Sequence, residues 1–446
     1  MYFSPLLNIH MLYAILKIII GLGTRLFYRE IKVKNKEFLE HDGPMIIIAN
    51  HPNSMMDGWI IAQACRQPIN FLAKGTFFNS PLKRRFLASL NMIPINRKVD
   101  LVTDGVNNED SFEACYKVLE AGKTLVVFPE GNSILERQLR ELRTGTARIA
   151  LEAENRNGGK LNLKIVPLGL FYSKAEKFRS SVMVTIEQGL FAKDYLEEYQ
   201  QNHSLAAKKL TEKFRVHLER VLITTESSEQ EKLIEDIFEI ICDVKQNKNV
   251  EENTHLLKSI KDKLEEIQLI QPYLVEEIQN LVKVIHWQSE KLEIKKEFLS
   301  KRFRSKRFLT QFVLSFFLLI LGLPLFIFGL IQSVIPYQLT SFLMPKLVKN
   351  VEYYAPIAIL LGLVFYPLNY ILFLHFVGDY FEFDSIGKIV YFVAMPLTGM
   401  IAFQFVQYLK NISFKWKYVF QIVNQNEALK ELRKLQSELK KIITVQ

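Results

Sequence analysis

Apolar and polar positions along residues 28–195 alternate in a way that predicts an α/β domain. Short apolar runs, interpreted as buried strands, are separated by segments with helical periodicity. The expected strands are Met45–Ala49, Asn70–Ala73, Ile93–Ile95, Thr124–Phe128, Lys164–Leu170 and Val182–Ile186. The expected helices are Trp59–Cys65, Pro81–Leu90, Ser111–Ala121 and Thr144–Asn155. This alternation favours a mostly parallel sheet flanked by helices.

The pattern changes after residue 195. Residues 196–300 lack glycine, and apolar residues such as Leu233, Ile237 and Ile241 recur at helical spacing. We therefore expect a helical insert made of amphipathic helices with charged outer faces. Residues 301–409 are expected to form a membrane region with two to three spans, and residues 410–446 a charged helical tail.

Three apolar segments make up the expected membrane region: Phe308–Val334, Ala355–Val377 and Ile386–Leu409. The first is interrupted at Gly322-Leu323-Pro324, so it either kinks across the bilayer or dips in and returns. The distribution of basic and acidic residues beside the segments favours a re-entrant first segment followed by two spans. This arrangement predicts that the α/β domain and the C-terminus both face the cytoplasm.

Residues 1–27 contain an apolar stretch, residues 6–23, that carries His10 and Lys17. Basic residues follow the stretch, whereas a cleaved signal peptide would carry them in front. Two interpretations remain, a marginal transmembrane helix and an amphipathic helix lying in the membrane interface. We favour the interfacial helix, because an ionisable residue in mid-span is costly in hydrocarbon.

The composition agrees with a chain partly in lipid. Hydrophobic residues make up 49% of the 446 residues. The chain contains 33 Phe, and its formal net charge is +10. A positive balance suits anionic lipid headgroups, phosphate substrates or nucleic acid. A dense basic run at residues 301–307 directly precedes an apolar segment, which argues for a membrane surface rather than nucleic acid. The localisation predicted is an integral protein of the cell (inner) membrane or an endoplasmic-reticulum type of membrane.

The three cysteines, Cys65, Cys115 and Cys242, have no paired spacing. This argues against a disulfide framework or a zinc site, and it is compatible with a reducing compartment. We expect neither a metal nor another cofactor.

The candidate chemistry centres on the stretch from Met45 to Gly58. An apolar run ends in a cluster of turn formers that contains His51 and Pro52, and Asp57 follows. Pro52 prevents a helix through His51, so the chain bends there and allows His51 and Asp57 to meet. A histidine held by a carboxylate is a general base of fixed tautomer. Taken alone, the same residues also suit a turn with a solvated histidine and an aspartate that caps the next helix.

Two further strand ends carry polar residues. Arg97 follows the expected strand Ile93–Ile95 and offers a planar fork suited to phosphate or carboxylate, although a solvated loop arginine has the same pattern. Glu130 and Gly131 follow Thr124–Phe128, where an ordinary strand-to-helix turn is the alternative. In sheets of this class ligands gather at the carboxyl ends of strands, so these residues are expected to converge on one edge.

Four blocks in this order resemble those of the glycerophospholipid acyltransferase family, which includes glycerol-3-phosphate and lysophosphatidic acid acyltransferases. The blocks are Asn50-His51…Asp57, Ile95-Asn96-Arg97, Phe128-Pro129-Glu130-Gly131 and Val166-Pro167. The resemblance covers roughly residues 28–195.

The resemblance implies a role for each block. His51 would be the general base on the acceptor hydroxyl, with Asp57 holding it, and no acyl-enzyme would form. Asn50, Arg97, Glu130 and Gly131 would form the acceptor site, with Arg97 on the acceptor phosphate. Val166 and Pro167 would lie along the acyl donor, which is acyl-CoA or acyl-carrier protein.

The sequence departs from the commonest pattern of this family in two places. Five residues instead of four separate His51 from Asp57, and Asn132-Ser133 replaces the usual Thr-Arg after the glycine. Both departures resemble a branch that acylates glycerol-3-phosphate or dihydroxyacetone phosphate. Because position 133 is not an arginine, we expect Arg143 to make the second phosphate contact.

The function expected is a membrane-bound O-acyltransferase of phospholipid biosynthesis, acting on glycerol-3-phosphate or dihydroxyacetone phosphate. A 1-acylglycerol-3-phosphate or other lysolipid acceptor is the first alternative. A non-catalytic membrane scaffold or transporter that uses the C-terminal spans is the second. Its expected partners are membrane lipids, the acyl donor and the glycerol phosphate or lysolipid acceptor, and no nucleic acid.

Overall fold

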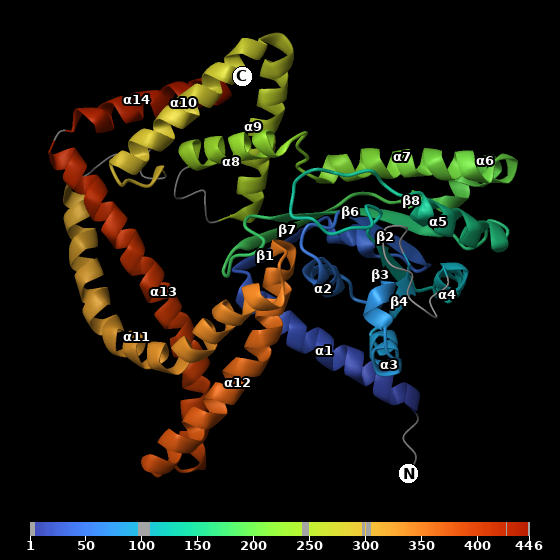
Figure 1. Cartoon of the computed structure of the whole chain (residues 1–446), viewed down its shortest axis with the longest axis horizontal. Coiled ribbons are helices and arrows are strands. Elements are labelled where there is room, and N and C mark those ends of the chain that lie inside the picture. Colours follow the sequence, from blue (N-terminus) through green and yellow to red (C-terminus); the bar gives the residue numbers. More distant parts are fainter. Residues whose placement is uncertain are drawn as a thin grey trace. The chain divides into compact units, whose positions relative to one another are not determined.

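The computed structural model describes residues 5–96, 108–242, 249–296, 299, 305–424 and 426–444. The chain divides into two compact units (Figure 1). The first comprises Met1–Ser227 and Asn350–Ile359, and the second comprises Ser228–Lys349 and Leu360–Gln446.

The first unit contains a sheet with helices on both faces. Its strands are β1 (Glu30–Lys34), β2 (Met45–Ala49), β3 (Ile69–Lys74), β4 (Met92–Ile95), β5 (Thr124–Val127), β6 (Lys164–Tyr172), β7 (Ser181–Ile186) and β8 (Leu190–Phe191). Its α-helices are α1 (Pro5–Phe27), α2 (Met55–Ala64), α3 (Pro81–Ser89), α4 (Asn108–Glu120), α5 (Gly145–Arg156), α6 (Leu196–Gln201) and α7 (His203–Val221).

The strand order is β1-β7-β6-β2-β5-β3-β4, with β8 paired to β6. The pairs along this order are parallel except β6–β7, and the short β8 also runs antiparallel to β6. The expected mostly parallel sheet flanked by helices is therefore confirmed. Parallel strands need crossover helices on the sheet faces, which is why β2 is apolar at every position and wholly buried.

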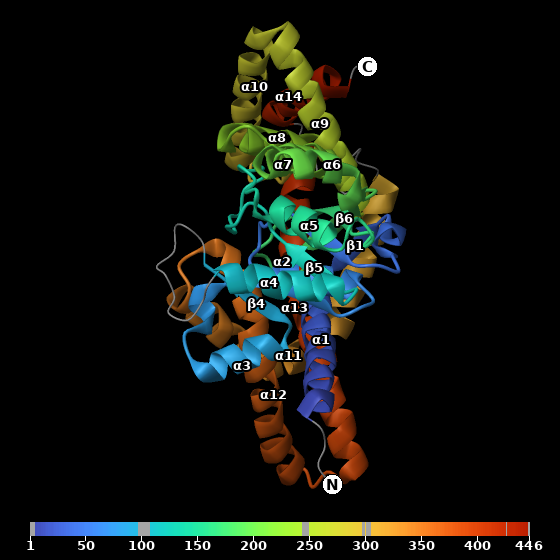
Figure 2. The ribbon, with the colours of Figure 1, turned by 90° about the vertical axis from the view of Figure 1, so that its right-hand side faces the viewer.

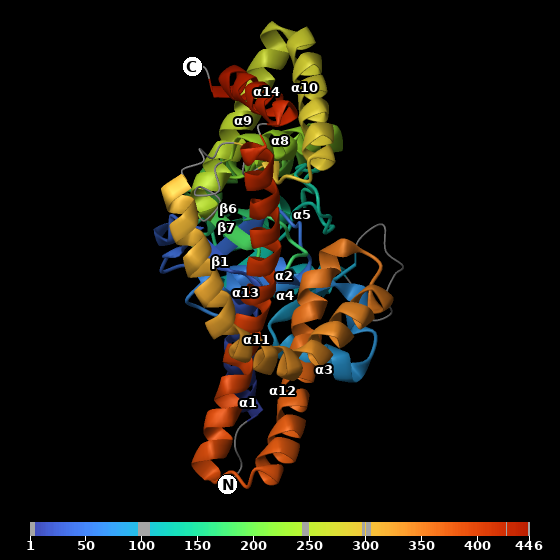
Figure 3. The same ribbon diagram turned by 90° about the vertical axis from the view of Figure 1, so that its left-hand side faces the viewer.

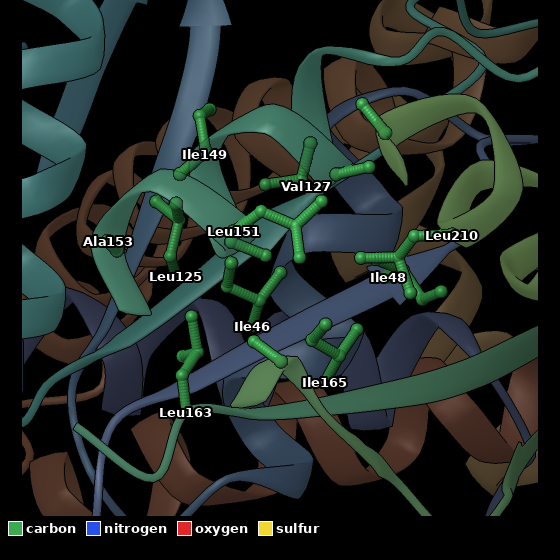
Figure 4. Packing of buried hydrophobic residues seen from close by; sticks show 14 of the residues in the cluster. Ile46, Ile48, Leu125, Val127, Ile149, Leu151, Ala153, Leu163, Ile165 and Leu210 are labelled. Atoms are coloured by element: carbon green, nitrogen blue, oxygen red, sulfur yellow. The ribbon is translucent and has the colours of Figure 1, made fainter. Parts of the chain in front are cut away.

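The core lies between the sheet and the helices α4, α5 and α7. Alternate residues of the central strands, among them Ile46, Ile48 and Leu125, point into this cluster and meet Ile149 of α5 and Leu210 of α7 (Figure 4). Helices α5 and α7 cover one face of the sheet, and α1 and α3 lie on the other side (Figures 1 and 2).

Helices α6 and α7 belong to this first unit, although the sequence placed residues beyond 195 in a separate helical insert. Helix α7 packs on α5 and β6, and its buried residues include Ala207, Leu210 and Phe214. Amphipathic periodicity shows that a helix has an apolar face, but it does not show which surface that face covers.

Helix α1 contacts the rest of the first unit with one of its sides only. Its Lys17 Nζ donates to the carbonyl of Cys65 at 2.9 Å, and Gln63 Nε2 donates back to the carbonyl of Lys17 at 2.8 Å. The opposite side exposes an apolar stripe at helical spacing, Met11, Ile15, Ile18, Ile19, Leu22 and Leu26. The lysine that argued against a membrane span thus faces the domain, and the interfacial position of α1 stays a prediction.

The second unit is helical in its described residues. Its helices are α8 (Ser228–Ile241), α9 (Val250–Ile270), α10 (Pro272–Lys291), α11 (Ser305–Leu347), α12 (Tyr354–Tyr380, which begins in the first unit), α13 (Ser385–Val423) and α14 (Glu427–Thr444). Helix α14 packs against α8, α9 and α10. Three segments are long and apolar enough to cross a membrane: Val313–Leu347, Val351–Tyr380 and Ser385–Val423.

At Gly322-Leu323-Pro324 the sequence predicted a kink or a re-entrant return, and the structure shows a continuous helix. Helix α11 runs through these residues as one element of 43 residues, which corresponds to about 65 Å of helix, and it is visibly curved (Figure 3). Proline is tolerated in a long apolar helix when a neighbouring helix supports it. Here α13 does so, because Gly322 lies against Phe405 of α13. The C-terminal tail likewise does not begin at residue 410, since α13 continues to Val423.

Polar groups join the three apolar helices of the second unit. Gln332 of α11 donates to the Tyr391 hydroxyl of α13 at 2.6 Å, and Asn369 of α12 donates to the Gln332 carbonyl at 2.8 Å. At Gly329 of α11, an added Cβ would lie 2.0 Å from the carbonyl oxygen of Thr398 in α13. Small residues and interhelical hydrogen bonds are what hold helices together in lipid.

Candidate active site

The strand order brings three chain segments to one edge of the sheet. Strand β2 lies between β5 and β6, and all three run in the same direction. Their carboxyl ends carry His51, Glu130 and Tyr172, respectively. Parallel neighbours lie about 4.8 Å apart, so residues at these ends can touch across the sheet.

The expected pair forms. His51 Nδ1 lies 2.8 Å from Oδ2 of Asp57, which is fully buried near the start of α2. Helix α2 begins at Met55, four residues before the predicted start, so Asp57 lies in its first turn. Because the carboxylate accepts, Nδ1 carries the proton and Nε2 is left as the basic nitrogen.

Two further donors hold Asp57. The backbone N–H of Asn53 donates to Oδ2 at 2.8 Å, and the hydroxyl of Tyr172 donates to Oδ1 at 2.6 Å. Burial, and then the Asp57 charge, raise the pKa of Tyr172 well above its usual value, so its hydroxyl stays a donor. Sequence reasoning missed Tyr172, which is 115 positions from Asp57 and has no local motif.

The ring of His51 is fixed on its face as well as at Nδ1. It stacks on Phe128, with ring centroids 3.9 Å apart and planes 8° from parallel. Its side chain is 20% exposed, and no hydrogen bond to Nε2 occurs in the described parts of the chain. The imidazole therefore presents a basic nitrogen to a partly open surface.

Glu130 ties the loops together. The backbone N–H of His51 donates to its Oε1 at 3.2 Å, and the N–H of Arg140 donates to its Oε2 at 3.3 Å. Burial raises the pKa of Glu130, and these two hydrogen bonds oppose that rise. The carboxylate thus fixes the backbone of the predicted base relative to the 130–143 loop.

Arg143 lies against Gly131. The glycine has φ +77°, and a Cβ built on it would lie 2.9 Å from Nε of Arg143. The N–H of Arg143 donates to the carbonyl of Pro129 at 2.9 Å, which holds the two segments side by side. Glycine at 131 permits both the left-handed backbone and the close approach of the guanidinium.

The two departures from the commonest family pattern meet in the structure. Ser54, in the longer loop between His51 and Asp57, has φ +49°, a conformation costly for a non-glycine residue. Its backbone N–H donates at 2.8 Å to the hydroxyl of Ser133, the residue that stands where an arginine is usual. The serine therefore supports the longer loop directly.

The remaining predicted residues lie elsewhere. Both polar atoms of the Asn50 amide bond the backbone of Leu170, at 2.8 and 3.0 Å, so this side chain braces β6. Val166 and Pro167 are buried in β6 beside β2, within the sheet, and do not meet His51. Arg97 lies outside the described residues; β4, which precedes it, is three strands from β2.

Comparison with known proteins identifies the class. The family model Acyltransferase matches residues 30–170. Among solved structures, the 1-acyl-sn-glycerophosphate (LPA) acyltransferase PlsC from Thermotoga maritima is similar, with a TM-score of 0.31 and 20% identity over 45% of this chain and 79% of that chain. No match was found among curated proteins. Residues 30–170 thus form an acyltransferase domain, and the protein is an acyltransferase.

Proposed function

We propose that the protein transfers a fatty acyl group from acyl-CoA or acyl-carrier protein to a hydroxyl of glycerol-3-phosphate or dihydroxyacetone phosphate. The observation that carries the proposal is His51 held by buried Asp57 at 2.8 Å, with Nε2 directed away from its partner. This geometry suits proton removal from an alcohol.

The chemistry is a single displacement. Nε2 of His51 takes the proton of the acceptor hydroxyl. At the same time, the hydroxyl oxygen of the acceptor attacks the thioester carbonyl carbon. The carbon–sulfur bond then breaks, and the departing thiolate takes the proton from the imidazolium. The products are an ester and a free thiol, and Asp57 stabilises the imidazolium between the two steps.

The acceptor assignment rests on a guanidinium beside the loop that holds His51. Arg143 lies against Gly131, one residue beyond the carboxylate that holds the His51 backbone. A guanidinium binds phosphate in a planar fork. Arg97 is the other proposed phosphate contact, and Val166-Pro167 is the proposed wall of the donor site.

The three long apolar helices associate the protein with a membrane. We place the acyltransferase domain on the cytoplasmic side, because a basic run at residues 301–307 precedes the first of these helices. Both a long-chain donor and a lipid product favour chemistry at the bilayer surface.

Replacement of the base tests the proposal. His51→Ala should lower acyl transfer by at least about 100-fold. His203→Ala is the matched control, because His203 is exposed at the start of α7. Both variants should keep the melting temperature and membrane retention of the natural protein. Normal activity of His51→Ala would remove the imidazole from the mechanism.

Competition between acceptors tests the substrate. The purified protein is given labelled acyl-CoA with equimolar glycerol-3-phosphate and lysophosphatidic acid, and the products are identified by mass spectrometry. We expect monoacylated glycerol phosphate that carries the labelled acyl group, which distinguishes it from the lysophosphatidic acid added as acceptor. Phosphatidic acid as the sole product would assign the enzyme to the lysolipid alternative while leaving the role of His51 intact.

A further inference from the structure

Helix α3 is unlike the other α-helices of the acyltransferase domain, because none of its nine residues is buried. It joins β3 to β4 and follows a 3-10 turn, Gly75–Phe78. Large apolar side chains project from it, with Leu82 80% and Phe86 49% exposed, and Phe77 in the turn is 46% exposed. The stability of a helix of this length is marginal in water without packing. An exposed apolar surface on such a helix indicates a binding surface.

The charges of α3 indicate which partner. Leu82 and Phe86 are one turn apart and share a face, and helical geometry places Lys83 and Arg85 on either side of that face. The helix contains no acidic residue. Apolar side chains flanked by basic ones are the pattern of a helix that lies in a membrane interface.

We propose that α3 and the preceding turn form a second membrane contact of the acyltransferase domain, seated in a leaflet that contains anionic lipid. Phe77, Leu82 and Phe86 enter the boundary between headgroups and acyl chains, and Lys83 and Arg85 bind headgroup phosphates. The inference goes beyond the proposed reaction and does not depend on the identity of the acceptor.

Two observations favour a bilayer over a protein partner. Helix α3 packs against α1, whose outer side carries the exposed apolar stripe, and both lie on the same side of the sheet (Figures 1 and 2). The same chain holds three helices able to cross a membrane, so a lipid surface is always within reach. A second copy of this surface would bring like charges together, which is unfavourable.

A contact of this kind has a consequence for access to the site. Strand β4 follows α3 and forms one edge of the sheet. Seating α3 in the leaflet holds this edge of the domain at the depth of the phospholipid headgroups, where a lipid product leaves.

Fluorescence quenching by lipid tests the contact in the full-length protein. The three natural cysteines are buried, so an introduced thiol can be labelled selectively with bimane. Leu82→Cys and Phe86→Cys report on α3. Lys160→Cys is the control, because Lys160 is exposed four residues after α5, a helix that covers the opposite face of the sheet (Figures 1 and 2). The labelled proteins are placed in nanodiscs of phosphatidylcholine and phosphatidylglycerol with nitroxide-labelled lipid.

We expect the labels at 82 and 86 to lose most of their fluorescence to the nitroxide, and the label at 160 to keep it. The loss should shrink when phosphatidylglycerol is omitted or when Lys83 and Arg85 are both changed to glutamine. Equal quenching at 82 and 160 would overturn the proposal. So would a blue-shifted but unquenched label at 82, which would show a protein cover. Because no readout uses acyl transfer, a failure here is distinct from a failure of the proposed reaction.

Discussion

The hydroxyl of Tyr172 is one of three donors that fix Asp57, and its removal should change the pH dependence of the reaction. In Tyr172→Phe the carboxylate has one donor fewer, so it holds the proton of the His51 imidazolium more strongly. The acidic limb of the kcat/KM profile should move to higher pH by about one unit, and activity should recover at alkaline pH. A pH–rate series on the purified protein measures this.

Tyr28→Phe is the matched control. Tyr28 is also buried and lies beside Tyr172, but its hydroxyl bonds Asn53 and the carbonyl of Ala175 instead of Asp57. Glu130 also contacts His51, and Arg140 lies beyond it; neither substitution touches these two groups. A similar fall at every pH in both variants would reduce Tyr172 to a packing role.

Gly131 offers a test of the Arg143 assignment. Gly131→Ala forces a side chain into a left-handed backbone and against Nε of Arg143, so the guanidinium must move. We expect a KM for glycerol-3-phosphate raised about tenfold or more, with a smaller change in kcat, because one charged hydrogen bond is worth roughly 1.5–3 kcal/mol. Gly145→Ala is the control, since Gly145 has open space around it and no positive φ. An unchanged KM for Gly131→Ala would exclude Arg143 as a phosphate contact.

Whether a contact in the site can be predicted from the sequence depends on how close the two contacting residues are along the chain. His51 and Asp57 could be paired because a proline-bearing turn separates them. Tyr172 could not be found, since only the pairing of β6 with β2 brings it to Asp57. Asn50 was expected at the substrate but bonds Leu170, because an amide suits a backbone as well as a ligand.

At the scale of elements, the apolar runs predicted six strands and missed β1 and the two-residue β8. All six expected strands are present, each within a few residues of its predicted bounds. Strand β1 was missed because it is half-buried at the sheet edge and its sequence, Glu-Ile-Lys-Val-Lys, is rich in charge. The start of α2 was placed too late because Met55 and Met56 follow directly on turn-forming residues.

Helix α7 should contribute to the stability of the acyltransferase domain. Phe214 of α7 is fully buried in the main core cluster, so Phe214→Ala should lower the free energy of unfolding of this domain by about 3–5 kcal/mol. Leu205→Ala, on the exposed side of the same helix, should have little effect. Hydrogen exchange of the β6 amides in the full-length protein reports the difference. Unchanged exchange in Phe214→Ala would mean that α7 is an independent insert, as the sequence alone indicated.

At the scale of the whole molecule, hydropathy located three apolar segments but could not show their continuity. Gly322 and Pro324 are helix breakers in water, so the sequence predicted a kink or a re-entrant return at this point. In α11 the neighbouring α13 supports them, which is information that no single segment contains. The packing of α11 on α13 therefore supports the continuous helix, and the re-entrant course stays a prediction.

This packing is tightest at Gly329, where an added Cβ would lie 2.0 Å from the Thr398 carbonyl oxygen and 2.3 Å from its carbon. Gly329→Ala should push α11 and α13 apart and lower the free energy of unfolding by about 1–3 kcal/mol, because backbone atoms cannot yield as a flexible side chain does. Gly362→Ala in α12, whose nearest neighbour would be 3.8 Å away, is the control and should be neutral or slightly stabilising. Thermal unfolding of both full-length variants in the same detergent measures the difference. Equal melting temperatures would show that the two helices do not meet at Gly329, and the continuous α11 would lose its support.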